Sequence, residues 1–479
     1  MSNSPDRPSS IRLNRRTLTI GAAGAALSGT GVVAAADHHG GPGNPVRRQD
    51  QPTATVISSA PPSSVPDGYA LVASPRLPLW DLASQDVGGI VSGQIPSWIE
   101  VGSAVDMPIT PVALEGSSLD GLNPTKTYKS YERLATFLNS PDGYGGVALV
   151  PADQVDARVN VLAVDGFDPV RMGQFDEPVF RIGYVGDIVP GRNVGIKMQQ
   201  YNDYTHPFHR VADLLASYDL TVANLEGNLS DTIEAPADPN TFSFISPTAM
   251  LDGFEMAGID VVSLANNHSV WNDSGWGTSA LIDTLDACQA RGIVTIGAGT
   301  NLENARFAYT GTFGGKTVAL IGIDGVTANI NEQPYGATVD RSYKGGDRYA
   351  GATDDTPGTN PYDPDIFIPD IQALAADYDI VIPYIHFGIE YVEAPPAWGV
   401  DGARSCIDAG ATLVVTNHPH VVQGMEFYNG APIVYSVGNF IFDQMFSVQT
   451  REGFILELVM RGNSCVQLRT RGVQIEDFN

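Results

Sequence analysis

The sequence predicts an α/β fold for residues 180–479 of the 479-residue chain. From Phe180 onward, short apolar runs of strand length alternate with segments whose apolar residues recur at helical spacing, and this alternation indicates layers of helix and sheet. After His420 the pattern changes to strands alone. Polar side chains follow several of the strands, at the position where open α/β sheets bind their ligands.

The expected elements of this region follow one another in order. Strands are predicted at residues 181–187, 220–223, 259–264, 293–296, 317–323, 380–385 and 412–415. Helices are predicted at residues 208–218, 250–257, 276–291, 371–376 and 403–409. The strands after His420 are expected at residues 424–428, 432–436, 454–460 and 466–470. Asn429-Gly430 between the first two predicts a β-hairpin, and residues 345–365 are predicted to form a long polar loop.

The N-terminus has the features of an export signal. Within residues 1–36, the pair Arg15-Arg16 precedes a Gly/Ala-rich run that ends in three alanines, and this pattern resembles a twin-arginine signal. The run is too poor in large apolar residues to be a good membrane span, and no other stretch is long and apolar enough to cross a bilayer. We therefore expect export to the cell envelope or the extracellular space. Residues 37–66 are expected to form a disordered linker.

Residues 67–175 are predicted to form a small α/β lobe. Its expected strands and helices lie at residues 69–74, 82–91, 131–138 and 146–151. Residues 87–102 resemble a segment of phosphate-type periplasmic solute-binding proteins, in which a helix, a glycine turn and an Ile-x-x-Trp element recur. The lobe lacks a convincing phosphate-gripping loop, so its ligand, if it has one, stays open.

Charge and cysteine content exclude several classes of partner and site. The chain has 27 basic and 54 acidic residues, a net charge of −27. Such a surface repels nucleic acid and anionic lipid, so we expect neither as a partner. The three cysteines are too few and too scattered for a disulfide framework or a cysteine-based metal site; one bridge could form, but we expect three separate buried thiols.

Candidate metal ligands gather at the ends of the predicted strands. These strand-end residues are Asp187, Asn224, Glu226, Asn266, Asn267, His268, His386, His418 and His420. Four of the eight histidines are among them, which is not the pattern expected of scattered structural histidines. The structural alternative is that the two asparagines form a turn and that Asp187 caps a helix.

Mixed oxygen and nitrogen ligands of this kind suit Mn, Fe or Zn in a two-metal site. Two such cations, about 3.5–4 Å apart, would share a bridging carboxylate and lower the pKa of water from 15.7 to about 7. His268 directly follows a candidate ligand. It is therefore placed to donate a proton to a leaving group or to bind a developing oxyanion.

Six motifs, in order over residues 180–478, resemble the CapA family, which is named for poly-γ-glutamate capsule synthesis and belongs to the calcineurin-like metallophosphoesterase superfamily. The motifs are Gly-Asp187-Ile-Val-Pro-Gly-Arg192, Ala-Asn224-Leu-Glu226-Gly, Ala-Asn266-Asn267-His268, His386-Phe-Gly-x-Glu390-Tyr, His418-Pro-His420-Val-Val-Gln423-Gly and Tyr-Ser-Val-Gly438-Asn439-Phe440-x-Phe-Asp443. The resemblance implies a four-layer sandwich of two β-sheets flanked by helices.

The resemblance also implies roles for individual residues. It implies a bridging role for Glu226 and a proton-carrying, catalytic role for His268. The implied metal ligands are Asp187, Glu226, Asn267, His386, His418 and His420. The expected substrate contacts are Arg192, Asn224, Asn266 and Glu390.

Several departures from the superfamily pattern affect the site. Glu226 replaces the usual aspartate, and Asp273 stands five residues after His268 instead of about three. Val189 stands where the superfamily usually has a histidine, so the first metal has one ligand fewer. His206 or His209 could replace it, although a loop role fits both residues better. Asn417 stands where the superfamily often has a histidine.

The sequence therefore predicts an exported, metal-dependent hydrolase-like protein of poly-γ-glutamate capsule or cell-envelope polymer metabolism. Metal-activated water would attack a phosphoester or a γ-glutamyl amide, and the partner would be a polyanionic envelope polymer or a phosphoester substrate. The alternative is a non-catalytic assembly or tethering component of a polymer-synthesis or export complex. Retention of both Asn267 and His268 favours catalysis, because a tethering protein does not need a proton carrier beside a ligand. A weaker third hypothesis, a solute-binding protein with an appended domain, rests on residues 87–102.

Overall fold

The computed structural model describes residues 10–14, 17–19, 64–117, 121, 123–270, 276–326, 351–476 and 478, with only the backbone of the first two segments. The remainder of the predicted signal, nearly all of the predicted linker and the first part of the predicted 345–365 loop lie outside the described residues. No helix in the described part of the chain combines the length and hydropathy needed to span a membrane.

The described residues divide into two compact units. The first contains residues 10–14 and 17–19, Arg181–Glu457 and the residues from Thr470 onward. The second contains the described residues from 64 to Phe180 together with Leu458–Arg469, a segment that lies almost three hundred positions further along the chain.

The first unit contains an eight-stranded sheet in the order β2-β1-β16-β17-β19-β20-β22-β21. Its strands are β1 (Ser10–Asn14), β2 (Thr17–Thr19), β16 (Ala308–Phe313), β17 (Lys316–Asp324), β19 (Ile380–His386), β20 (Val414–Asn417), β21 (Met425–Tyr428) and β22 (Ala431–Val434). The strands β17, β19, β20 and β22 are parallel neighbours. The predicted hairpin is confirmed between β21 and β22, where Asn429 and Gly430 have φ values of 51° and 84°, as a type I′ turn requires.

A seven-stranded sheet forms the second large layer of this unit, in the order β14-β13-β10-β9-β24-β25 with β23 also paired to β9. Its strands are β9 (Val179–Ile188), β10 (Leu220–Leu225), β13 (Val261–Ser263), β14 (Val294–Ile296), β23 (Asn439–Ile441), β24 (Glu452–Arg461) and β25 (Ser464–Gln474). Two small two-stranded sheets pair β11 (Asn228–Leu229) with β12 (Ile245–Ser246) and β15 (Ala298–Gly299) with β18 (Gly358–Thr359).

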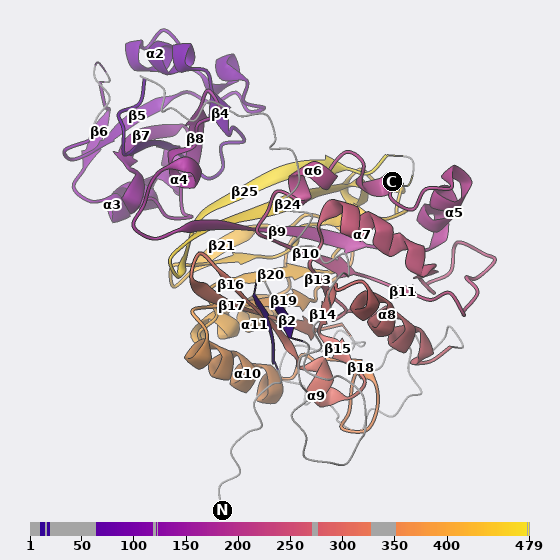
Figure 1. Cartoon of the computed structure of the whole chain (residues 1–479). Helices are drawn as coiled ribbons and strands as arrows, with labels where there is room; N and C mark the ends of the chain where they lie inside the picture. The colour runs from indigo at the N-terminus through magenta and orange to yellow at the C-terminus, as the bar shows by residue number, and fades with distance from the viewer. Residues whose placement is uncertain are drawn as a thin grey trace, which may run out of the picture. The chain divides into compact units, whose positions relative to one another are not determined.

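Helices cover both large sheets of the first unit (Figure 1). They are α5 (Arg192–Tyr201), α6 (Ala212–Leu215), α7 (Leu251–Ala257), α8 (Ser279–Ala290), α9 (Leu302–Ala305), α10 (Pro364–Asp377) and α11 (Ala397–Asp408). Apolar residues of α10 and α11 share a buried cluster with the eight-stranded sheet, and those of α7 and α8 share one with the seven-stranded sheet. The sheets meet where the Tyr184 and Tyr384 rings lie 5.5 Å apart. This arrangement confirms the predicted α/β sandwich of two sheets flanked by helices.

The predicted helix at 208–218 is wrong. The structure has a 3-10 turn, η4 (His206–Phe208), and then the four-residue α6. Val211 interrupts the helix because its φ of −123° lies outside the helical region, and its N–H bonds to the carbonyl of Phe208, only three residues back. The sequence prediction also missed α5, which directly follows the first strand of the unit.

The second unit is built on a six-stranded sheet in the order β4-β8-β3-β7-β5-β6. Its strands are β3 (Tyr69–Ala73), β4 (Asp81–Leu82), β5 (Thr110–Leu114), β6 (Lys126–Tyr128), β7 (Gly146–Pro151) and β8 (Asn160–Val164). Its helices are α2 (Ser84–Ser92), α3 (Tyr131–Leu138) and α4 (Pro169–Met172). Within this unit, Val459 and Val466 join the apolar core, and Arg469 forms a buried 2.7 Å ion pair with Asp168. The three cysteines are free and buried, as predicted.

Candidate metal centre

The strand-end residues come together because both large sheets direct the carboxyl ends of parallel strands toward one place. In the seven-stranded sheet, Asp187 lies near the end of β9, Glu226 directly follows β10, and Asn267 and His268 lie shortly after β13. The eight-stranded sheet contributes His386 at the end of β19, and His418 and His420 follow β20. All of these side chains are buried.

Two triads of metal-ligand type share one carboxylate. Asp187, Glu226 and His420 form one triad, and Glu226, His386 and His418 form the other; within each, the candidate donor atoms all lie within 4.8 Å of one another. Glu226 Oε1 lies 3.7 Å from His420 Nε2 and 3.8 Å from His386 Nε2. These separations exceed hydrogen-bond length but match two donors that each lie about 2.1 Å from one cation.

Glu226, the carboxyl group that the two triads share, has no hydrogen-bond donor among the described residues. Neither Oε1 nor Oε2 of this fully buried side chain accepts a hydrogen bond from any residue that the structure describes. A buried carboxylate without a partner costs on the order of several kcal/mol, and a bound cation removes that cost. The donor set and the orphaned oxygens together fit a divalent cation.

A chain of buried amides orients Asp187. Asn266 Nδ2 donates to Asn224 Oδ1 at 3.1 Å, and Asn224 Nδ2 donates to Asp187 Oδ1 at 2.6 Å. Asn417 Nδ2 donates to the same oxygen from the opposite sheet. Because both amides take Oδ1, the other carboxylate oxygen of Asp187 is directed to His420, whose Nδ1 lies 3.1 Å away. Asn224 and Asn266, expected as substrate contacts, thus position a candidate ligand.

The remaining candidate ligands lie against one another. His386 Nε2 is 3.0 Å from Asn267 Oδ1 and 3.2 Å from His418 Nδ1. On the far side of the cluster, Asn439 Oδ1 lies 3.0 Å from His420 Nδ1. The structure therefore brings all six predicted metal ligands into one buried group.

His268 is held at the edge of this group by an aromatic ring and a carbonyl. Its ring stacks on Phe244 with centroids 4.1 Å apart, and its Nδ1 lies 3.1 Å from the carbonyl oxygen of Phe242. Because a carbonyl only accepts, Nδ1 carries the proton. Nε2 then faces the cluster, 3.8 Å from Glu226 Oε1.

The electrostatics of the cluster follow from burial and mutual proximity. Burial, reinforced by the charge of Asp187, raises the pKa of Glu226 well above its usual range. Burial lowers the pKa of His268 to about 3, with a contribution from His420. Burial and neighbouring imidazoles also lower the pKa values of His386 and His418. Burial lowers the pKa of His420 too, but Asp187 outweighs this effect and the net pKa is raised.

Two expected substrate contacts lie outside the cluster. The Arg192 guanidinium is paired with the buried carboxylate of Asp443 at 3.2 Å and donates to the carbonyl of Pro239 at 2.9 Å. Glu390 lies in the exposed segment after β19, and its charge contributes to the raised pKa values of Glu226 and His420.

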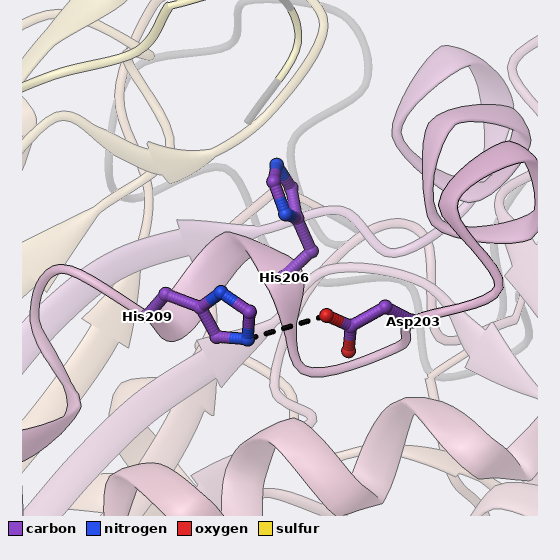
Figure 2. A group of neighbouring side chains, drawn as sticks. All are labelled: Asp203, His206 and His209. Carbon is purple, nitrogen blue, oxygen red and sulfur yellow. Dashed lines mark ion pairs between the residues drawn. The ribbon is translucent and has the colours of Figure 1, made fainter.

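No histidine replaces the one that the superfamily usually has at the position of Val189, among the residues that the structure describes. That side chain is fully buried beside Phe244 and Phe442 in an apolar cluster. His206 and His209 group with Asp203 instead of with either triad (Figure 2). They are therefore not substitutes for the absent histidine.

Sequence reasoning missed three residues of the site. Asn417, noted as a departure from the superfamily pattern, and Asn439, in the sixth motif, were not expected to orient Asp187 and His420. Phe244 had no detectable signal, because it lies in a stretch without strand or helix periodicity.

The fold and the cluster define a layered α/β protein with a candidate metal centre between two sheets. Residues 181–444 match the family described as "Bacterial capsule synthesis protein PGA_cap", and the chain belongs to this family. The match covers more than half of the chain and includes every residue of the two triads.

Known proteins with similar sequences include two capsule proteins. The chain is 28% identical over 307 residues to "PGA biosynthesis protein CapA" of Bacillus subtilis (strain 168), which covers 64% of this chain and 74% of that protein. It is 27% identical over 301 residues to "Capsule biosynthesis protein CapA" of Bacillus anthracis, covering 61% and 67%. A phosphate transport receptor from Vibrio cholerae is 25% identical over 22% of this chain and about half (48%) of that structure, with a TM-score of 0.20. This similarity is too low to assign a ligand to any part of the chain.

Proposed function

We propose that this chain is an exported, metal-dependent hydrolase of capsule or cell-envelope polymer metabolism, with poly-γ-glutamate or a phosphoester as substrate. One observation carries the proposal: two ligand triads share Glu226, and both oxygens of that buried carboxylate lack a hydrogen-bond partner among the described residues. The names of the Bacillus relatives, which refer to capsule and PGA biosynthesis, support a polymer of this kind as the substrate.

The residues that would hold divalent cations are Asp187, Glu226, Asn267, His386, His418 and His420. When bound, cations in such a site supply Lewis acidity and lower the pKa of water. Glu226 would serve both positions, because it is the member common to the two triads. Asn224, Asn266 and Asn417 keep Asp187 oriented during the reaction.

His268 moves the proton in this proposal. Its Nδ1–H stays on the Phe242 carbonyl, so only Nε2 is available to the reacting groups. Nε2 takes the proton released as water attacks and passes it to the leaving oxygen or nitrogen. Stacking on Phe244 fixes the ring for this exchange.

The test combines metal content with turnover in the full chain. His418→Ala should lose metal, whereas His268→Ala should keep metal and lose hydrolysis of phosphoesters or of poly-γ-glutamate. Glu457→Gln is a control, because this carboxylate is buried in the same unit but belongs to neither triad. Metal binding without any turnover on either substrate would favour the assembly or tethering role instead.

A further inference from the structure

A second cluster of metal-ligating side chains lies outside the candidate centre. Asp203, His206 and His209 each offer one donor atom, and these atoms lie within 4.8 Å of one another (Figure 2). The three residues are spaced at intervals of three along a turn that contains the 3-10 element η4. We propose that Asp203, His206 and His209 form a surface site for a divalent transition-metal ion such as Zn²⁺. This inference does not depend on the proposed function.

The geometry is close to that of a metal site. Donors around a tetrahedral zinc ion lie about 3.3 Å apart, given bonds of about 2.0–2.1 Å. Asp203 Oδ2 and His209 Nε2 are already separated by 3.3 Å. One donor atom of His206 lies within 4.8 Å of these two atoms, so the His206 ring must move to complete the site. One carboxylate and two imidazoles suit zinc and leave a coordination position for water.

The carboxylate is oriented and ionised before any metal binds. Thr205 donates to Asp203 Oδ1 from its backbone N–H at 2.9 Å and from its hydroxyl at 2.6 Å, which leaves Oδ2 toward His209. The Thr205 side-chain bond is also the main cause of the lowered pKa of Asp203. The His206 ring lies 4.5 Å from the ring of Tyr201 and 5.5 Å from that of His209.

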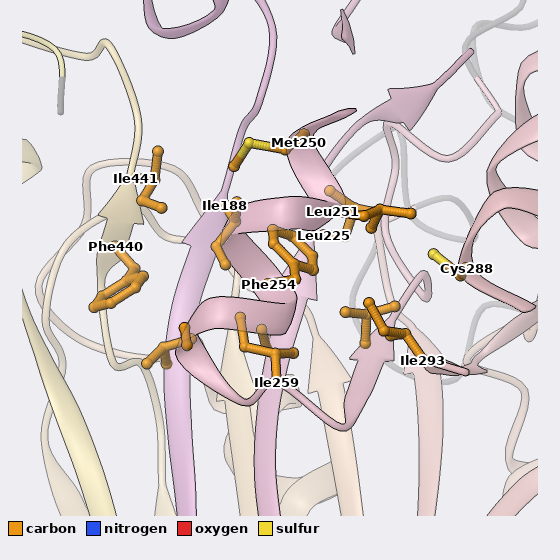
Figure 3. Packing of buried hydrophobic residues seen from close by; sticks show 14 of the residues in the cluster. Ile188, Leu225, Met250, Leu251, Phe254, Ile259, Cys288, Ile293, Phe440 and Ile441 are labelled. Atoms are coloured by element: carbon orange, nitrogen blue, oxygen red, sulfur yellow. The ribbon is translucent and has the colours of Figure 1, made fainter. Parts of the chain in front are cut away.

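The site is open to solvent but rests on the core. The side chains of His209 and Asp203 are 48% and 32% exposed, so an ion can enter directly. Between the two histidines, Phe208 is fully buried and its ring lies 5.6 Å from that of Phe254 in α7 and 6.4 Å from that of Phe440 in β23. Figure 3 shows Phe254 and Phe440 in this apolar cluster. A bound ion would therefore stabilise a turn that the packing of Phe208 already anchors to the core.

The experiment measures zinc equivalents by mass spectrometry after dialysis of the full chain against buffered Zn²⁺. His206→Ala, His209→Ala and Asp203→Asn should each bind one equivalent fewer than the wild type. Asp213→Asn, an exposed carboxylate just beyond the same turn, should bind as much as the wild type. Thr205→Val should weaken the site by about tenfold, because the hydroxyl that it removes bonds Asp203 Oδ1 at 2.6 Å and lies 3.0 Å from His209 Nε2, and so orients both ligands.

Two further arms make the outcome decisive. His38 and His39 are the two histidines that belong neither to this site nor to the candidate metal centre. A His38→Ala/His39→Ala variant should therefore bind as much zinc as the wild type. Glu226→Gln should lose zinc from the candidate centre and keep this equivalent, so failure here and failure of the proposed function are distinguishable. An anomalous zinc peak among the three side chains would support the inference. Unchanged zinc content in both His206→Ala and His209→Ala would overturn it.

Discussion

His420 places Nδ1 3.0 Å from the side-chain oxygen of Asn439, which together with Asp187 Oδ2 at 3.1 Å gives that nitrogen two acceptors. The amide oxygen accepts, so Nδ1 carries the proton and Nε2 keeps its lone pair toward the carboxylate, 3.7 Å away. Histidines that bind metals are commonly fixed in this way by a partner on the second nitrogen. Asn439 is thus a positioning residue of the candidate centre.

Replacing Asn439 should weaken metal binding without removing a ligand. Asn439→Ala should lower affinity by about 10–100-fold, because His420 loses one of the two acceptors that hold its ring, and only Asp187 Oδ2 remains. Asn439→Asp keeps an oxygen toward Nδ1 but replaces the amide that donates to the Thr450 carbonyl at 2.9 Å, so it should restore only part of the affinity. Chelator competition measures both variants. Equal affinity of Asn439→Ala and the wild type would show that His420 needs no such partner.

Glu226→Gln should stabilise the metal-free protein while abolishing stabilisation by metal. The folded-state pKa of Glu226 is raised, so its contribution to stability is present below about pH 4.5 and is lost as pH rises through the raised value. With chelator present, Glu226→Gln should therefore melt at a higher temperature than the wild type, and this difference should grow from pH 5 to pH 8. A gain of about 1 kcal/mol corresponds to a few degrees. A difference that is constant or falls with pH would contradict this account.

His268→Ala should reduce turnover by about 10²–10⁴-fold, the usual contribution of a general acid or base, and leave metal content unchanged. Phe244→Leu should cause a smaller loss of kcat, because Nε2 keeps its proton chemistry but loses the stacked ring that orients it. Steady-state kinetics on metal-loaded protein provide the measurement. Full activity of His268→Ala would remove this residue from the mechanism.

Arg192→Met should destabilise the fold, because it leaves the buried carboxylate of Asp443 without its cation. The cost should be about 1–3 kcal/mol, since Asn193 still donates two hydrogen bonds to that carboxylate. Arg192→Met/Asp443→Asn should recover much of the loss in denaturant unfolding. If Arg192 also contacts a substrate anion, as the sequence suggests, KM should rise in both variants. No stability loss in the single variant would refute the structural role.

The sequence predicted the strand-end ligands because a polar residue directly after an apolar run is a local signal. It did not predict the orienting network, since Asn417 and Asn439 act across sheets and only tertiary structure brings them to Asp187 and His420. The helix predicted at 208–218 failed for another reason. Buried residues such as Phe208, Ala212 and Leu215 recur at intervals of three or four, and a 3-10 turn followed by a short helix satisfies the same spacing. The clustering of His206 and His209 with Asp203 depends on that turn.

The most direct test compares the metal content of the Asp203→Asn variant with that of the Asp203→Asn/Glu226→Gln double variant, so that the surface site contributes to neither. We predict about one to two transition-metal equivalents per chain in the single variant and at least one equivalent fewer in the double variant. Equal metal content in the two proteins, or no metal in either after dialysis against Mn²⁺, Fe²⁺ or Zn²⁺, would contradict the shared role of Glu226.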